Sequence, residues 1–411
     1  MNKKIHIIGG GTVFHLRPHL ALCSTAYGET ARKLAGICRV KSDTLDTELH
    51  LTKMAGGSKL ETNNDINRLV ENLVTDPLTK IVFLTAALCD FEGSVNEVTA
   101  NKYGERLHSR DEGVVNVSLI PAQKIVKNIR SNRKDIFAVA FKTTCGATSD
   151  EQYIAGLKLL KESSVNLVLA NDVKTRLNMI ITPEEARYCE TNDRNQVLQE
   201  LVDITLKRSH LTFTRSTVVA GETIPWNSPL VPQALRTVVN YCIAGGAYKP
   251  FLGATVGHFA AKLSDNTFLT SIRKTNFNDL DKYGLVKVVT DGPDSVIAFG
   301  AKPSVGGMSQ RIVFHDHVDY DCICHFHCLK REGSLVPVVS QKMIECGSMA
   351  CGNNVSNNLK QFGNLSAVYL DNHGPNIVFN SSIDPQEVID FIESNFDLTT
   401  KTGGYVSSEK L

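Results

Sequence analysis

The sequence predicts the α/β fold class. In the first half, short and nearly continuous apolar runs alternate with amphipathic segments of helical period. Strands that are apolar on both sides belong to sheets covered on both faces, and their alternation with helices is typical of parallel sheets. We therefore expect a doubly wound, Rossmann-like parallel sheet in residues 1–208. Its expected strands are 5–8, 81–84, 136–141 and 167–170, and its expected helices include 65–74 and 149–161.

The second half has a different pattern, with short strands and Gly or Asp turns mixed with helices from residue 229 onward. Residues 209–228 are Thr-rich, lack a helical period and contain the only Trp, which is typical of a connector. The sequence thus predicts two domains, 1–208 and 229–411, joined by residues 209–228.

Two helix starts are marked by their side chains. Ser149, with Gln152 three residues later, predicts a capping box at the start of one helix. Asp384 followed by Pro385 predicts the N-cap and the first helical position of the last helix.

The composition restricts the compartment and the partners. Lys and Arg number 44 against 43 Asp and Glu, and a net charge of +1 provides no overall field that would attract nucleic acid or a membrane. No apolar run approaches the roughly 18 residues that span a bilayer, and the first residues lack a signal-peptide core. Eleven cysteines, an odd number in a long chain, are expected to be mostly buried thiols. We expect a cytoplasmic protein that binds small-molecule substrates.

A Gly-rich turn follows the first expected strand. Gly9, Gly10, Gly11 and Thr12 can place backbone N–H groups against a phosphate at the start of a helix. Phe14 occupies the third glycine position of the dinucleotide fingerprint, which disfavours a nicotinamide-dependent oxidoreductase. Spacing alone leaves two alternatives open, a nucleotide or phosphate site and a simple tight turn.

Five short motifs of the first half occur in order: Gly-Gly-Thr at 10–12, Ser-Thr-Ala at 24–26, Ala-Ala-Leu-Cys-Asp at 86–90, Phe-Lys at 141–142 and Ala-Asn-Asp at 170–172. Together they resemble phosphopantothenoylcysteine synthetase, a ligase that activates a carboxylate with a nucleoside triphosphate and couples it to cysteine. The resemblance implies a role for Lys102 in stabilising phosphoryl charge. It also implies that CTP or ATP contacts Gly10, Gly11, Thr12, Ser24, Ala86, Ala87, Asp90, Phe141 and Asn171.

The chain departs from this family at functional positions. Leu22 stands where the family has an Asn that contacts the acyl-nucleotide intermediate, and Thr144 replaces a Glu. We therefore expect little phosphopantothenoylcysteine synthesis. The alternatives that remain open are a capping role for Asp90 and a solvated surface position for Lys102.

Three histidines of the second half have metal-ligand spacing. On a strand, His325 and His327 would point to one face, and the three cysteines of 322–328 would point to the other. His373 follows the expected strand 367–370. Three imidazoles with an open fourth position are the pattern of catalytic zinc.

Four segments of the second half carry a second resemblance: Gly-His-Phe-Ala-Ala-Lys at 257–262, Lys-Pro-Ser at 302–304, Val-Asp through His-Phe-His at 318–327 and Leu-Asp-Asn-His-Gly at 370–374. They resemble the class II aldolase/adducin family over roughly residues 230–396. The resemblance implies an α/β/α domain, a catalytic divalent metal, usually zinc, on His325, His327 and His373, and substrate contacts from Lys302 and Ser304. The implied activity is lyase chemistry on a small, phosphorylated hydroxy-carbonyl compound.

The acidic residue that serves as the base in this family is replaced by Gly306. Proton transfer still needs a positioned group, and we name His258 and Lys262 as catalytic candidates. Three further residues are weaker candidates, and two of them are expected to be a partly exposed pair at a helix end: His315, His317 and Glu345.

The sequence therefore predicts a bifunctional enzyme in which a ligase-like, nucleotide-binding domain is fused to a metal-dependent, aldolase-like domain. Both resemblances imply a homo-oligomer. The alternative from a different class is a non-catalytic scaffold that retains both folds, which would not need a metal on three histidines.

Overall fold

The computed structural model describes residues 2–95, 98–99, 102–108, 110 and 113–404. The chain divides into two compact units. The first contains residues Met1–Thr182 and Cys189–Ser209, and the second contains Pro183–Tyr188 and His210–Leu411. No helix in the described part of the chain is long and apolar enough to cross a membrane.

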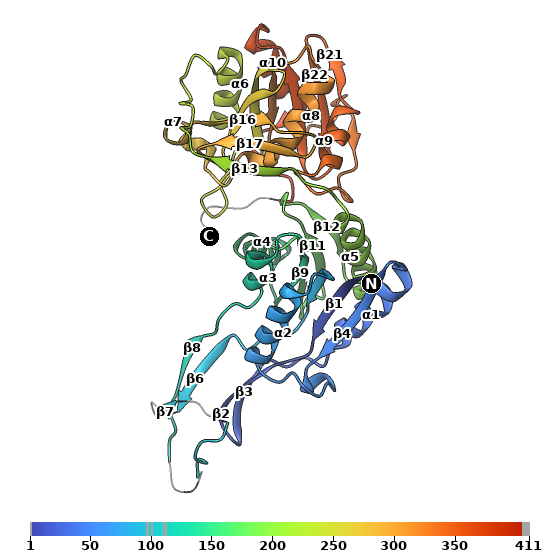
Figure 1. The fold of residues 1–411 in the computed structure, drawn as a ribbon, viewed down its shortest axis with the longest axis vertical. Helices are drawn as coiled ribbons and strands as arrows, with labels where there is room; N and C mark the ends of the chain where they lie inside the picture. The colour runs from blue at the N-terminus through green and yellow to red at the C-terminus, as the bar shows by residue number, and fades with distance from the viewer. Residues whose placement is uncertain (1, 96–97, 100–101, 109, 111–112, 405–411) are drawn as a thin grey trace. The chain divides into compact units, whose positions relative to one another are not determined.

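The first unit is built on a seven-stranded sheet in the order β12-β11-β10-β9-β5-β1-β4, coloured blue to green in Figure 1. The five strands from β10 to β4 run parallel, and β11 is antiparallel to β10. The bounds are β1 Lys3–Gly9, β4 Leu45–Leu51, β5 Thr79–Leu84, β9 Phe137–Thr144, β10 Leu167–Asp172, β11 Asn178–Ile181 and β12 Arg187–Thr191.

Helices cover both faces of this sheet, which confirms the doubly wound prediction (Figure 1). One face carries α1 and α5, which contact each other, and the other carries α2, α3 and α4. Their bounds are α1 Glu29–Lys41, α2 Asn63–Thr75, α3 Lys127–Asn132, α4 Ser149–Ser163 and α5 Arg194–Ser209, with a short 3-10 turn at Lys53–Ala55.

Shorter strands lie outside the main sheet of the first unit. One hairpin pairs β2 with β3, and a small sheet has the order β7-β6-β8. The bounds are β2 Val13–Arg17, β3 Leu20–Cys23, β6 Phe91–Val95, β7 Val98–Thr99 and β8 Val117–Pro121.

The second unit is built on a ten-stranded sheet in the order β13-β17-β16-β15-β14-β18-β23-β22-β20, with β21 also on β22. Most neighbours are antiparallel, and the pairs β13–β17 and β20–β22 are parallel. The bounds are β13 Arg215–Val219, β14 His258–Ser264, β15 Thr267–Ser271, β16 Leu285–Thr290, β17 Ser295–Phe299, β18 Cys322–His325, β20 Val338–Val339, β21 Lys360–Phe362, β22 Leu365–Leu370 and β23 Gly374–Phe379.

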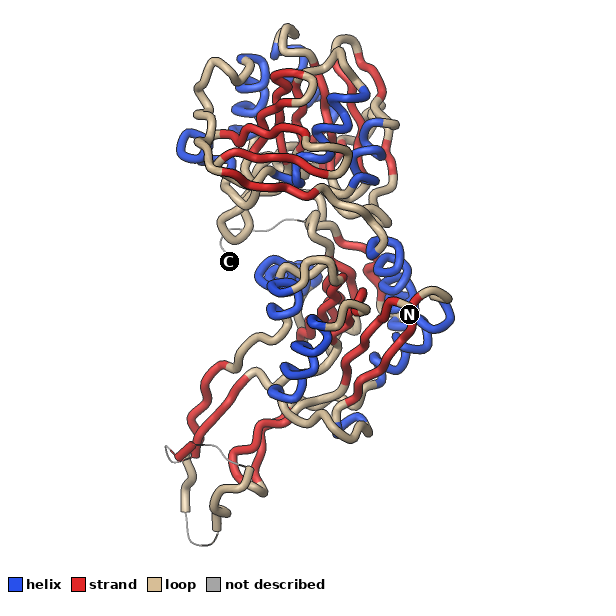
Figure 2. Tube along the Cα trace, viewed as in Figure 1, coloured by secondary structure: helices blue, strands red, loops and turns tan. Residues whose placement is uncertain are grey.

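Two separate apolar clusters fill the space on the two sides of this sheet. The larger one includes the buried faces of α6 and α10, and the smaller one includes those of α8 and α9. Figure 2 shows the red strands between blue helices, the α/β/α layering that the sequence resemblance implied. The remaining bounds are α6 Gln233–Ala244, α7 Leu280–Tyr283, α8 Met308–Asp316, α9 Met349–Ser356, α10 Pro385–Asn395, β19 Leu329–Lys330, β24 Phe396–Asp397 and the 3-10 turns Phe277–Asp279 and Ser304–Gly307.

The segment 209–228 is not a plain connector. Within it, β13 pairs in parallel with β17 and forms one edge of the sheet of the second unit. Trp226 is buried in the larger apolar cluster, and its Nε1–H donates to Asn240 Oδ1 at 3.1 Å. An edge strand has one unpaired side and an exposed face, so its sequence lacks the apolar run that marks a central strand.

The helix starts are close to those expected. Asp384 caps α10 with Pro385 in its first turn, as predicted. The capping box of α4 lies one residue earlier than expected, because the N-cap is Thr148 and its partner is Glu151. All eleven cysteines are free thiols and most are buried, which confirms that prediction.

Candidate functional site

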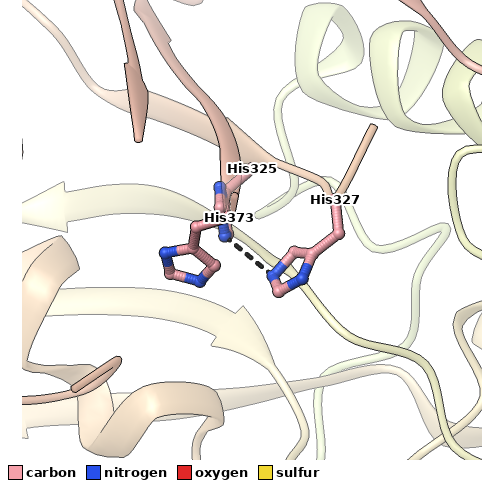
Figure 3. Close-up of side chains that lie close together, drawn as sticks. All are labelled: His325, His327 and His373. Atoms are coloured by element: carbon pink, nitrogen blue, oxygen red, sulfur yellow. Dashed lines mark hydrogen bonds between the residues drawn. The ribbon is translucent and has the colours of Figure 1, made fainter. Parts of the chain in front are cut away.

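Three histidines from adjacent parts of the second sheet meet at one point (Figure 3). His325 is the last residue of β18, His327 follows two residues later, and His373 lies in the turn between β22 and β23. Gly374 makes this approach possible, because its φ is +121° and a Cβ there would lie 2.1 Å from the Phe326 carbonyl oxygen. A side chain at this position would push the turn that carries His373 away from the strand end.

The geometry of the three imidazoles fits a metal ion. All three rings are buried, with 1–3% of each residue exposed. His325 Nε2 and His327 Nε2 are 3.2 Å apart, and one nitrogen of each histidine lies within 4.8 Å of the others. Zinc–nitrogen bonds of about 2.0–2.1 Å in a tetrahedron place two ligand atoms about 3.3–3.4 Å apart. The residues therefore fit a divalent ion such as zinc.

The two histidines of the His-x-His motif converge for a different reason from the one the sequence suggested. Strand β18 ends at His325, so His327 does not share a strand face with it. The chain beyond the strand turns the two rings toward each other. The three cysteines of 322–328 do lie in the larger apolar cluster, on the side of α6 and α10, as expected.

A backbone carbonyl orients the ring of His325. Its Nδ1–H donates to the Pro375 carbonyl oxygen at 2.7 Å, which leaves the lone pair on Nε2 for a ligand. Burial lowers the pKa of His325 to about 4, against the smaller opposing effect of this hydrogen bond. The ring is therefore neutral at pH 7, as a metal ligand must be.

His258 lies beside the three histidines. It is directly opposite His325 in the β14–β18 pair, and the two ring centroids are 4.9 Å apart. Its buried Nδ1 has no hydrogen-bond partner among the described residues. Burial, and then the nearby His325, hold its pKa well below the usual value, so its ring is neutral at pH 7.

Three of the other proton-transfer candidates lie away from the triad, whereas the fourth, Glu345, is buried next to Cys346 and so near His373. Lys262 is four residues along β14 from His258, about 13 Å at the usual rise of a strand, and pairs with Asp265 at 3.1 Å. His315 is exposed, and His317 Nε2 lies 2.9 Å from the Ser356 carbonyl oxygen, as expected for a partly exposed pair. The structure thus places His258, and not Lys262, next to the three histidines.

The turn at Ser304–Gly307 contains three consecutive residues in the left-handed region. Val305, Gly306 and Gly307 have φ values of 44°, 67° and 74°. A β-branched residue is strained there, and such strain gathers at functional sites. Ser271 donates a hydrogen bond to Ser304 Oγ at 2.9 Å, and the Lys302 side chain is exposed.

In the first unit, most of the expected nucleotide residues gather where parallel strands end. Gly10, Gly11 and Thr12 follow β1, and Ala86, Ala87 and Asp90 lie between β5 and β6. Asn171 is the last residue but one of β10, Phe141 lies within β9, and Ser24 follows β3. The carboxyl ends of such strands form the ligand crevice of open α/β sheets. Six of the expected residues therefore lie at the carboxyl end of the main sheet: Gly10, Gly11, Thr12, Ala86, Ala87 and Asn171.

The Gly-rich turn is bonded within the protein. Gly11 N–H donates to the Ala26 carbonyl oxygen at 2.7 Å, and Thr12 N–H donates to that of Ala87 at 3.0 Å. The Thr12 hydroxyl donates to Asn63 Oδ1 at 2.7 Å. The chain then enters β2, and α1 begins only at residue 29. For Gly11 and Thr12, these bonds favour the tight-turn alternative over a phosphate cradle at a helix start.

Asp90 and Lys102, the two charged candidate residues of the first unit, both form ion pairs. Lys124 Nζ lies 2.6 Å from Asp90 Oδ1 at the surface. Lys102 Nζ lies 2.7 Å from Glu61 Oε2, and Lys53 Nζ lies 3.0 Å from the same atom. Hydrogen bonds from Lys102 and then Lys53 lower the pKa of Glu61 to about 2. Asp90 thus forms an ion pair at the surface. The Lys102 side chain is partly exposed and is bound to Glu61.

Both halves of the chain are similar to solved structures, each with a TM-score below 0.5. No family model matches the sequence, and no curated protein matches it either. One half of the chain is similar to the DNA/pantothenate metabolism flavoprotein from Streptococcus pneumoniae: identity is 16%, the match covers 49% of this chain and 97% of that one, and the TM-score is 0.42. The C-terminal domain of a coenzyme A biosynthesis bifunctional protein gives 17% identity, 50% and 94% coverage and a TM-score of 0.37.

The other half is similar to L-fuculose 1-phosphate aldolase, with 17% identity, coverage of 41% of this chain and 84% of that one, and a TM-score of 0.31. At these identities the likeness concerns the fold alone. These are the two families that the motifs of the sequence resemble.

Beside the histidine triad lies a pair of cysteines that no sequence motif marks. Sulfur atoms of Cys346 and Cys351 lie within 4.8 Å of each other and of a His373 nitrogen. A hydrogen bond from Cys346 lowers the pKa of Cys351, whereas the pKa of Cys346 is raised. Their spacing of five residues matches no common zinc motif, so only the fold reveals the pair.

Proposed function

We propose that the second unit is a metal-dependent lyase in which His325, His327 and His373 bind one divalent ion, zinc by preference. The observation that carries the proposal is the convergence of three buried imidazoles whose nitrogens face one another. A hydrogen bond between His325 Nε2 and His327 Nε2, 3.2 Å apart, joins only these two rings. A metal ion can accept a lone pair from each of the three rings.

The proposed substrate is a small, phosphorylated hydroxy-carbonyl compound. A bound ion in such a site supplies Lewis-acid polarisation of a carbonyl and stabilisation of an enediolate. Because Ser271 donates to Ser304 Oγ, the Ser304 hydroxyl can donate its own proton to a phosphate oxygen. The exposed Lys302 would add a positive charge on the same turn.

We assign the proton transfer to His258. Gly306 has no side chain to supply a carboxylate, and its φ of +67° would strain any replacement. The His258 ring lies beside His325, and its buried Nδ1 has no hydrogen-bond partner among the described residues, so His258 is positioned to take a proton from the substrate and return it.

The test is a retro-aldol assay with a panel of phosphorylated ketoses and aldonates. Wild-type protein should form triose phosphate or a related fragment. It should lose this activity on chelation and regain it when zinc is added. His327→Ala should be inactive with or without added zinc. His315→Ala, an exposed histidine of the same unit, is the matched control. Turnover that is equal in His327→Ala and wild type would contradict the proposal.

For the first unit we propose binding of a nucleoside triphosphate at the carboxyl ends of β1, β5, β9 and β10. The support is the gathering of six of the expected residues at that end of the sheet, together with the motif resemblance. Since Gly11 and Thr12 N–H groups already have partners, Lys102, Ser24 and Asn171 are the proposed contacts. Calorimetric titration of CTP and ATP tests this, and no heat with either at millimolar concentration would contradict it.

We also propose a homo-oligomer, as both resemblances imply. Sedimentation at several protein concentrations measures the assembled mass, and a monomer at all concentrations would contradict it. A metal-free protein would favour the scaffold alternative over both enzymatic proposals.

A further inference from the structure

A second set of metal-capable side chains lies in the first unit, at the edge of its sheet. His6 is on β1, and Glu48 and His50 are on the edge strand β4. In the parallel register His6 is paired with Glu48, and His50 is two residues further along the same strand. Residues two apart on a strand share a face, so the three side chains meet on one side of the sheet.

The distances among the three side chains fit one ion. His6 Nδ1 lies 3.1 Å from His50 Nε2 and 3.4 Å from Glu48 Oε2, and His50 Nε2 lies 3.9 Å from Glu48 Oε2. Ligands at about 2.0–2.2 Å from a tetrahedral zinc ion are about 3.3–3.5 Å apart. We propose that His6, Glu48 and His50 form a binding site for one divalent transition-metal ion, distinct from the histidine triad of the second unit.

Two of the atoms that would not bind the ion, one on His6 and one on Glu48, already have partners. His6 Nε2 lies 3.3 Å from Thr79 Oγ1, and Lys4 Nζ lies 2.7 Å from Glu48 Oε1. A proton on His6 Nε2 directed at Thr79 leaves the lone pair on Nδ1. Groups that orient ligands in this way accompany most metal sites in proteins.

Access and protonation also suit an ion from solution. His6 forms the buried base of the site at 1% exposure, whereas the His50 and Glu48 side chains are 22% and 42% exposed. Burial, followed by the neighbouring His50, lowers the pKa of His6 to about 4, so its ring is neutral at pH 7. Two neutral imidazoles and one carboxylate are a donor set that zinc and its neighbours in the first transition series accept.

An ordinary histidine–carboxylate pair is the plainer explanation, and the chain supplies an example for comparison. His15 Nε2 lies 3.3 Å from Glu61 Oε1 in the same unit. Among the described residues, no second imidazole joins this pair in a metal-capable group. The cluster on β1 and β4 differs from that pair by the second imidazole at 3.1 Å. A pair of that kind should bind zinc weakly, and the cluster should bind it stoichiometrically.

The experiment uses the full-length chain with His325→Ala and His327→Ala, so that the triad is absent. Zinc is titrated in competition with a chromophoric chelator, and cobalt(II) absorption reports the coordination geometry. One equivalent should bind, and His50→Ala or Glu48→Gln should each weaken binding by about 100-fold or more, beyond the roughly 10–100-fold loss seen when only an orienting group is removed. His15→Ala is the matched control and should bind zinc like its parent.

Two results would overturn the proposal: no equivalent bound in this background, or an equivalent that is insensitive to both His50→Ala and Glu48→Gln. Should the double histidine variant fail to fold, the difference in zinc content between wild type and His50→Ala answers the same question, because His50 is partly exposed. The outcome is independent of the triad, whose loss is measured by His325→Ala in the other unit.

Discussion

The Gly-rich turn of the first unit and the histidine triad of the second differ in what their polar groups already contact. Around the turn, Gly11 and Thr12 donate to carbonyl or amide oxygens of the protein itself. In the triad, His325 Nε2 faces His327 Nε2, and both are buried. The N–H groups of the turn are held by oxygens of the protein, whereas the nitrogens of three buried imidazoles lie close enough together to bind one cation. Motif order therefore indicates a fold, and the convergence of ligand atoms on one point indicates a candidate metal site.

The largest effect is expected from the proton-transfer residue of the second unit. His258→Asn should lower retro-aldol turnover by about 10²–10⁴-fold, the usual contribution of a positioned acid or base, and should leave the zinc content unchanged. Lys262→Met, a change on the same strand far from the triad, is the control. A loss of zinc in His258→Asn would instead make His258 a ligand or a support for one.

The pH dependence of stability offers a second test of the triad. With metal removed, His325 has a pKa of about 4 in the folded protein and the ordinary value of 6.5 in the unfolded chain. Between these values the unfolded chain binds a proton that the folded one does not, so the free energy of unfolding falls as the pH falls. The loss for this group is roughly 3 kcal/mol by pH 4.

Urea denaturation in chelator at several pH values between 7 and 4 measures this loss. His325→Gln should show a shallower fall than the wild type, because glutamine does not titrate. Equal slopes for the two proteins would show that His325 is protonated in the folded state at mildly acidic pH, contrary to its burial.

The first unit can be tested by restoring a residue that the family uses. Leu22→Asn should raise any trace ligase activity with CTP or ATP, 4′-phosphopantothenate and cysteine by about 100-fold, the usual worth of one intermediate-contacting donor. Leu22→Gln, which carries an amide one methylene further out, is the control. A wild-type rate equal to that of an ordinary synthetase would show that Leu22 is no impediment.

The smallest effect is expected at the cysteine pair. Cys351→Ser should leave the zinc content of the second unit unchanged if three histidines and an open position form the site. A fall in zinc content would place the Cys351 thiolate among the ligands, and the site would then be closed. Cys242→Ser, a buried cysteine in the larger apolar cluster, controls for the loss of a thiol.

The sequence predicted the central strands well and the edges poorly. β1, β5, β9 and β10 are apolar on both faces, so their runs are continuous. Strand β4, Leu45–Leu51, was not predicted, because an edge strand with Asp, Thr, Glu and His between its leucines has no such run. β13 was assigned to a connector for the same physical reason. These two strands show that sheet edges depend on tertiary pairing that local patterns do not contain.

The triad could be named from the sequence because all three histidines belong to short local motifs. The sets Cys346–Cys351–His373 and His6–Glu48–His50 could not, since each is assembled by strand pairing or loop packing. The bonds of Gly11 and Thr12 to Ala26 and Ala87 were equally invisible, because they join segments far apart in the chain.

The central claim is that His325, His327 and His373 bind one divalent ion. The most direct measurement is the zinc content, by plasma mass spectrometry after dialysis against a weak chelator, of His50→Ala protein with and without His325→Ala. The His50→Ala change removes the proposed site on β4 from the count. We predict one equivalent when His325 is present and close to none when it is replaced. Equal content in the two proteins would contradict the account.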